Sequence, residues 1–167
     1  DDLGNDGPDY TFGWGRLNAA RAWQAIVDER FTSGAVDQGQ QQLHTIEVPA
    51  GVGELRVMLY WMDPEASLQA PAALVNDLDL LGTDPQTLTH EPWELANTPV
   101  ASILAAPALR GADHVNNVEQ VAVLAPAQGT WTFTVTGGNV PEGPQAYYLV
   151  HEFLPEGPRI TYPLAGD

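Results

Sequence analysis

The pattern of hydrophobic and polar residues changes its period once along the chain, from helical to extended. From Gly15 to about Phe31, apolar side chains recur at the spacing of one helix face, at Leu17, Ala20, Trp23, Ile26 and Val27. Beyond Ser33 and Gly34 the apolar positions alternate with polar ones, which is typical of strands with one buried face. We therefore predict one N-terminal helix followed by a β domain.

The predicted strands cover residues 44–48, 55–61, 74–81, 119–124, 130–136 and 145–153. In the fifth of these, we expect Trp131, Phe133 and Val135 to face the core and the intervening threonines to face water. Residues 82–117 show little periodicity and indicate a long irregular region. A helix followed only by strands predicts a mainly β fold, an antiparallel jelly-roll β-sandwich preceded by one N-terminal α-helix.

The charge of the chain narrows its choice of partners. There are 22 acidic and 6 basic residues, and the net charge is −16. Such a charge repels nucleic acids and anionic membranes, so neither is an expected partner. It fits a secreted protein, a calcium binder or a protein adapted to high salt. Cysteine is absent, so disulfides and thiolate metal sites are excluded.

Several motifs resemble one family of enzymes. The segment GPDYTFGWGRLNAARAW, residues 7–23, resembles the last turn and C-terminal helix of the subtilisin-like serine protease catalytic domain. Further motifs occur in the order found in the C-terminal β-sandwich of KP-43-like bacterial proteases, a relative of the P domain of proprotein convertases. They are YWMDP (60–64), LVNDLDL (74–80), PWEL (92–95), RGADHVNNVEQV (110–121) and NVPEGPQAYYLV (139–150).

The resemblance implies a division of the chain into three parts. Residues 1–33 would be the tail and last helix of a catalytic domain, 34–155 a P-domain-like sandwich, and 156–167 a linker or the start of a following domain. It also implies a secreted protein and a catalytic domain in cis as partner. The function expected for this chain is a non-catalytic accessory domain that stabilises the protease and contributes to substrate engagement.

No catalytic residue is expected within the chain itself. A nucleophilic serine needs a positioned base and an oxyanion hole. The serines at positions 33, 67 and 102 lie outside any such motif, and the histidines at positions 44, 90, 114 and 151 are scattered singly. The Ser-His-Asp triad that the resemblance implies would lie upstream.

Two groups of oxygen-bearing side chains could bind calcium, which prefers several carboxylate and carbonyl ligands. The first comprises Asp63, Asn76, Asp77 and Asp79, and the second Asp113, Asn116 and Glu119. Asp77 and Asp79 project from one strand face, where like charges repel unless they are solvated, protonated or bridged by a cation. The alternative is structural: Asp63 caps a turn, and Asp77 and Asp79 form a solvated face.

Other residues carry two interpretations each. Asn117, next to Asn116, is expected to tie down the long incoming loop rather than to bind an ion. Trp93 is expected to pin the same loop onto the sandwich, or alternatively to stack on a sugar. Tyr147 and Tyr148 alternate across a strand, so one of them belongs to the core.

Two further functions remain open from the sequence. One is a calcium-dependent carbohydrate- or protein-binding jelly roll that targets its host, and the other is an adhesive spacer. Because a bare apolar stripe is unfavourable in water, we also expect residues 17–27 to pack onto the sandwich or onto a second copy of the chain.

Overall fold

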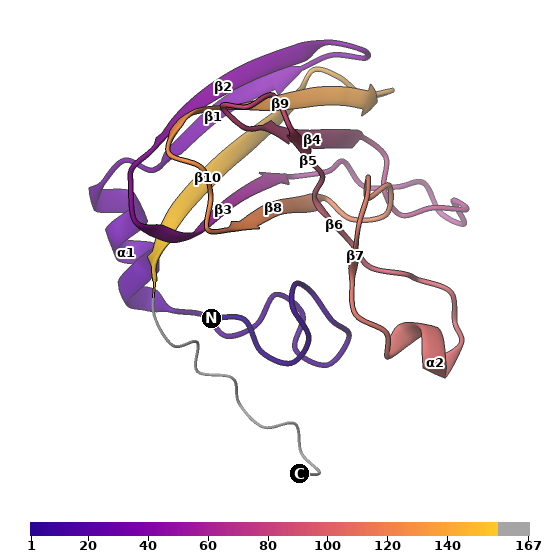
Figure 1. Ribbon diagram of the computed structural model, residues 1–167. Helices are drawn as coiled ribbons and strands as arrows, with labels where there is room; N and C mark the ends of the chain where they lie inside the picture. The colour runs from indigo at the N-terminus through magenta and orange to yellow at the C-terminus, as the bar shows by residue number, and fades with distance from the viewer. Residues whose placement is uncertain (157–167) are drawn as a thin grey trace.

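Antiparallel pairing of strands with one apolar face gives the molecule two stacked sheets. The computed structural model describes residues 1–156 (Figure 1), and the expected linker at 156–167 lies almost entirely outside this range. One sheet has the strand order β1-β10-β3-β8 and the other β2-β9-β4-β5. The strands are β1 (Phe31–Val36), β2 (Gln41–Val48), β3 (Val52–Trp61), β4 (Asp77–Thr83), β5 (Thr89–His90), β8 (Val118–Leu124), β9 (Gly129–Asn139) and β10 (Gln145–Pro155).

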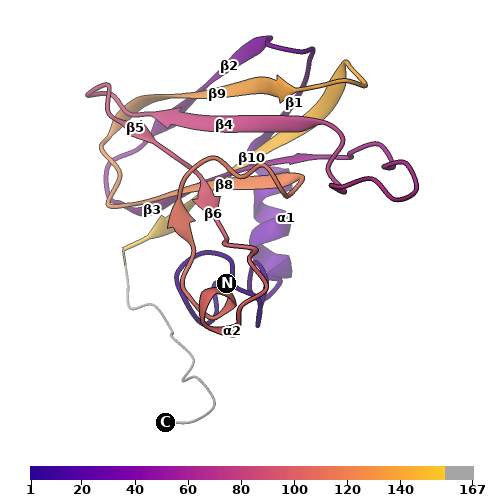
Figure 2. The ribbon, with the colours of Figure 1, turned by 90° about the vertical axis from the view of Figure 1, so that its right-hand side faces the viewer.

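Figure 2 shows the two layers of the sandwich, with β2, β9 and β4 above β10, β8 and β3. All pairings within both sheets are antiparallel, and the long strands alternate between the sheets along the chain. This confirms the predicted fold class, a mainly β sandwich with an N-terminal helix. No helix among residues 1–156 is long and apolar enough to cross a membrane.

The core lies between the two inner faces. Trp131, Phe133 and Val135 of β9 are buried there as predicted, and their threonine neighbours are at least partly exposed. The rings of Trp131 and Phe133 stack with centroids 6.2 Å apart. Of the two adjacent tyrosines, Tyr147 is in the core and Tyr148 is exposed. The period of two residues along these strands is therefore a direct consequence of burial on one face.

The N-terminal helix is shorter than the sequence predicted. Helix α1 (Ala19–Val27) begins after Asn18, whose side chain accepts a hydrogen bond from the backbone of Arg21. It ends before Glu29, which adopts a positive φ of 53° that no helix interior tolerates. The predicted continuation to Phe31 is wrong, because Phe31 opens β1 and pairs with β10. Strand β1 also spans residues 33 and 34, where the sequence suggested a domain boundary.

The apolar face of α1 is turned to solvent. Trp23 is 66% exposed, and Leu17, just before the helix, is 83% exposed, so the expectation that the apolar side chains of residues 17–27 pack onto the sandwich is wrong. The polar side of the helix makes the attachment: the Arg21 guanidinium lies 2.7 Å from Asp1 and 3.1 Å from Glu152 of β10. The expected contact with a second copy of the chain stays a prediction.

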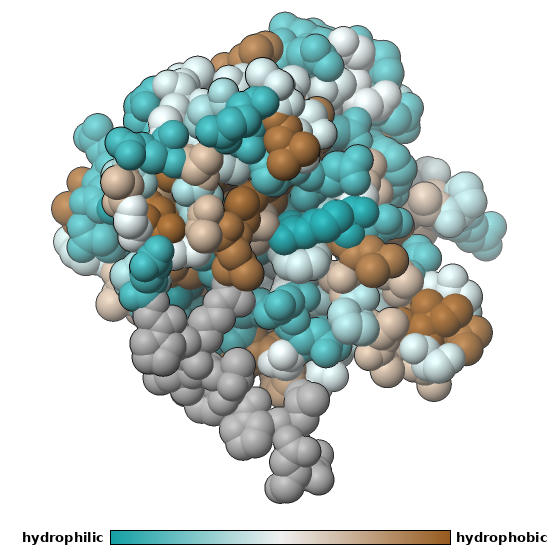
Figure 3. Space-filling model, viewed as in Figure 1, coloured by the Kyte–Doolittle hydropathy of each residue, from teal (hydrophilic) through white to brown (hydrophobic). Residues whose placement is uncertain are grey.

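The long region between β4 and β8 contains short elements rather than one irregular loop. Strands β6 (Trp93–Glu94) and β7 (Leu109–Arg110) pair and carry the single-turn helix α2 (Ala101–Leu104) away from the sheets (Figure 1). Apolar side chains, among them the exposed Val100 and Ile103, gather at this tip, at the lower right of Figure 3. This hairpin contacts the N-terminal loop, since the Tyr10 hydroxyl donates to the carbonyl of Ala96 at 3.0 Å.

Trp93 joins the hairpin to the N-terminal loop. The Arg110 guanidinium carbon lies 3.3 Å from the centroid of the indole ring. The backbone of Gly7 also lies against the ring, so closely that a Cβ at this position would be 2.7 Å from it. These contacts place Trp93 between the hairpin and the N-terminal loop, and a sugar could stack on the ring only by displacing these protein groups. The expected packing onto the sandwich stays a prediction.

We predict that Gly7→Ala weakens this junction more than Gly13→Ala does. Both glycines have positive φ values, 80° and 58°, so alanine is strained by about 1–2 kcal/mol at either position. Only at Gly7 does the added carbon also meet Trp93, which costs about 1–3 kcal/mol more. Urea denaturation measures the difference, and hydrogen exchange in residues 1–16 localises it. Equal losses in the two variants would contradict the close packing of Gly7 on Trp93.

Candidate metal centre at the start of strand β4

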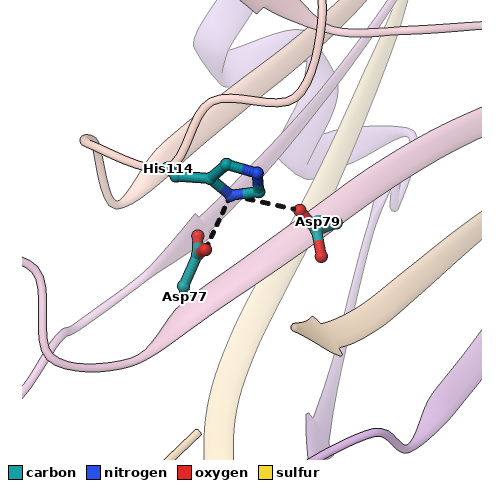
Figure 4. Close-up of side chains that lie close together, drawn as sticks. All are labelled: Asp77, Asp79 and His114. Atoms are coloured by element: carbon teal, nitrogen blue, oxygen red, sulfur yellow. Dashed lines mark hydrogen bonds and ion pairs between the residues drawn. The ribbon is translucent and has the colours of Figure 1, made fainter. Parts of the chain in front are cut away.

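Two carboxylates stand side by side where β4 begins. Leu78 and Leu80 of this strand point into the core, so Asp77 and Asp79 project from the opposite face of the sheet. His114, from the loop that precedes β8, turns its ring toward both of them (Figure 4). Its Nδ1 lies 2.7 Å from Asp77 Oδ2 and 3.7 Å from Asp79 Oδ1. One donor atom from each residue lies within 4.8 Å of the others, a spacing that could hold a metal ion.

The electrostatic environment of this group favours a cation. Burial raises the pKa of Asp77 against the opposing effect of His114, and the charges of Asp113 and Asp63 make smaller contributions in the same direction as burial. Burial and the Asp77 charge likewise raise the pKa of Asp79. The second oxygen of Asp77, Oδ1, is shielded from solvent and has no hydrogen-bond partner. A buried carboxylate oxygen without a partner is costly, and a bound cation would remove that cost.

Glu119 is a third carboxylate close to this group. It is fully buried, and it accepts hydrogen bonds from the backbone N–H of Leu80 at 2.6 Å and of Asp113 at 3.3 Å. Desolvation raises the pKa of Glu119 to about 9, and the charges of Asp79 and Asp113 act in the same direction. Glu119 therefore joins β4 to the loop before β8. The two predicted groups of ligands lie in one region of the molecule.

Asp63 and Asn76 lie outside the group of three donors, and their polar atoms serve the fold. The carboxylate of Asp63 accepts from the backbone N–H of Val75 and of Asn76, at 2.8 and 2.7 Å. The Asn76 amide donates to Glu142 and Gln145, and its carbonyl accepts from the N–H of Glu142. These bonds favour the structural interpretation, in which both residues fix the turn that leads into β4.

Asp113 and the two asparagines shape the loop that carries His114. Asp113 Oδ1 accepts from the N–H groups of Val115 and Asn116, and its Oδ2 accepts from the Asn116 side chain at 2.6 Å. The Asn117 side chain donates to the carbonyl of Trp61 at 2.8 Å, which fastens the loop to β3 as expected. Neither Asp113 nor Asn116 belongs to the group of three donors.

His114 is the donor that sequence reasoning missed. It was one of four histidines that looked isolated along the chain. Its position becomes meaningful only because β4 of one sheet contacts β8 of the other, which brings residues 77 and 114 together. Within residues 1–156, the side-chain hydrogen bonds of the histidines go to Tyr147, Asp84 and Asp77, and none of them joins a serine.

We predict that the chelator-treated protein loses stability between pH 7 and pH 9. In this window the folded state keeps the proton on Glu119, whose pKa is about 9, whereas unfolded chains release it near 4.5. The unfolded state then binds fewer protons, so the free energy of unfolding falls as the pH rises, by at most about 1.4 kcal/mol per pH unit. Urea denaturation at pH 7, 8 and 9 measures this slope. Glu119→Gln should flatten it, and an unchanged slope in that variant would refute the assignment.

Comparison with known proteins gives a weak structural likeness and no match in sequence. No protein-family model matches the chain, and no curated protein matches it. Among solved structures, the chain is similar to the Bacillus licheniformis lipase BlEst2 in propeptide form, with a TM-score of 0.46 and 19% sequence identity. The alignment covers 75% of this chain and 22% of that chain, so this chain spans about a fifth of the lipase structure. A likeness of this size assigns neither a family nor an activity.

Proposed function

We propose that this chain is a non-catalytic accessory sandwich of a secreted subtilisin-like serine endopeptidase, and that calcium stabilises it. The observation that carries the cation is the convergence of Asp77, Asp79 and His114, together with the unpaired buried oxygen of Asp77. Calcium is the ion expected from the sequence, because the residues of the two predicted groups offer carboxylate and amide oxygens. A bound ion would neutralise two like charges and tie β4 to the loop before β8.

The accessory role rests on the sequence motifs and on one structural feature. The motifs follow the order of the C-terminal sandwich of KP-43-like proteases across most of the chain. The exposed apolar face of α1, with Trp23 and Ile26, offers a surface on which a neighbouring catalytic domain would pack. In this proposal the sandwich stabilises the protease and borders its substrate.

A targeting module is the second candidate, and one observation favours it. Tyr60 and Tyr148 lie directly opposite each other on neighbouring strands and are 44% and 52% exposed. Exposed aromatic side chains with a polar tip are common where proteins bind sugars or other proteins. This pair would make the outer face of the β1-β10-β3-β8 sheet the binding surface of such a module.

We predict that millimolar Ca²⁺ raises the melting temperature of the chain above its value in chelator. At a hundred times its dissociation constant, a ligand adds about 2.7 kcal/mol, which corresponds to roughly 5–10 °C for a domain of this size. Asp77→Asn should abolish the shift. Glu65→Gln, which removes one exposed carboxylate from the loop before β4, should keep it. If the native chain shows no shift, the calcium proposal fails.

We predict a second result for the longer protein that would contain this chain. It should hydrolyse casein, and phenylmethylsulfonyl fluoride should abolish the activity, because the proposed parent uses a nucleophilic serine. The isolated 167 residues should not hydrolyse casein. Deletion of residues 34–155 should shorten the half-life of the activity at elevated temperature. A long form without inhibitor-sensitive activity would argue against the protease and in favour of the targeting module.

A further inference from the structure

The donor atoms at the start of β4 are not those that calcium prefers. Calcium takes about 6–8 oxygen ligands, whereas imidazole nitrogen suits zinc and its neighbours among the transition metals. Here one of the three converging donors is the imidazole Nδ1 of His114, and the others are carboxylate oxygens of Asp77 and Asp79. Figure 4 shows the ring aimed between the two carboxylates. An ion that used all three donors would have to accept nitrogen.

The supply of further oxygen ligands is also small. Asn76 and Asp113 adjoin the donors in sequence, and the charge of Asp63 acts on Asp77. The side-chain oxygens of all three already accept hydrogen bonds from the protein. The remaining coordination positions would therefore go to water, and His114, which is 62% exposed at its side chain, leaves the site open to it. Three protein ligands with water at the fourth position are the usual set of a catalytic zinc site, whereas structural zinc sites have four protein ligands.

The protein holds each of the three donors in place. Asp77 is largely buried, and a bound cation would pair with its Oδ1, which has no hydrogen-bond partner. Asp79 lies over Gly138, where any Cβ would collide with its Oδ2, so the glycine makes room for this carboxylate. His114 lies in a turn that Asp113 fixes, because Asp113 Oδ1 accepts hydrogen bonds from the backbone N–H groups of Val115 and Asn116.

From these observations we propose that the site formed by Asp77, Asp79 and His114 binds a Zn²⁺-like divalent ion. This ion competes with calcium for the two carboxylates, and it alone uses the imidazole of His114. The proposal rests on the proposed cation site and adds the class of ion that the site selects. The calcium-bound form uses the carboxylates and leaves the ring of His114 in solvent.

Titration of the full chain, with any affinity tag removed, tests this proposal. Zn²⁺ binding is measured by calorimetry, and Co²⁺ serves as a coloured substitute whose visible absorption reports nitrogen ligation. We expect Zn²⁺ to bind at least tenfold more tightly than Ca²⁺. His114→Ala should weaken Zn²⁺ and Co²⁺ at least tenfold and leave the calcium-induced rise in melting temperature unchanged. His114→Glu should make the donors all oxygen and reverse the preference.

His90→Ala is the matched control. His90 also faces an aspartate, with Nε2 3.5 Å from Asp84 Oδ2, but it does not belong to the group of three donors. Its removal should leave Zn²⁺ and Co²⁺ binding unchanged. If His114→Ala binds Zn²⁺ as the native chain does, or if Ca²⁺ binds more tightly than Zn²⁺, the proposed selectivity is wrong, although a cation site remains. If neither ion binds the native chain, the selectivity and the cation site are both wrong.

Discussion

The burial of one carboxylate between β8 of one sheet and β4 of the other is the constraint on which the candidate site depends. Glu119 belongs to β8, yet its side chain accepts a hydrogen bond from the backbone of Leu80 in β4. A second bond, from the N–H of Asp113, draws in the loop that carries His114. Burying a carboxylate is unfavourable, and the raised pKa of Glu119 reflects that cost. The same contacts set the distance between His114 and the two aspartates.

Much of the fold could be predicted from the sequence, because burial on one face leaves a period of two residues. The alternation Trp131, Phe133, Val135 is such a case, and all three side chains are in the core. Strand β1 was missed because its alternation is weak: Gly34 contributes no side chain, and Phe31 is exposed despite being apolar. A single glycine and one outward aromatic were enough to hide the element from pattern reasoning.

The candidate site was only half predictable, for a different reason. The outward direction of Asp77 and Asp79 follows from the strand period, and both residues were named as ligands on that ground. The role of His114 depends on contact between strands far apart in the sequence, which no local pattern encodes. Conversely, Asp63 and Asn76 have the right chemistry for ligands, but their side chains are already engaged in hydrogen bonds within the protein. Residue type shows what a side chain can bind, and packing decides whether it is available.

The outward apolar face of α1 and the charge of the chain together constrain what can cover that face. Exposed Trp23 and Leu17 favour burial against another surface. A second copy would bring two bodies of net charge −16 together, and this repulsion acts over about 10 Å at 0.1 M salt. A less acidic partner is repelled less strongly, so at ordinary ionic strength the charge favours a different domain over a second copy as the surface that covers this face. At about 1 M salt the screening length falls to about 3 Å, and the electrostatic argument against self-association disappears.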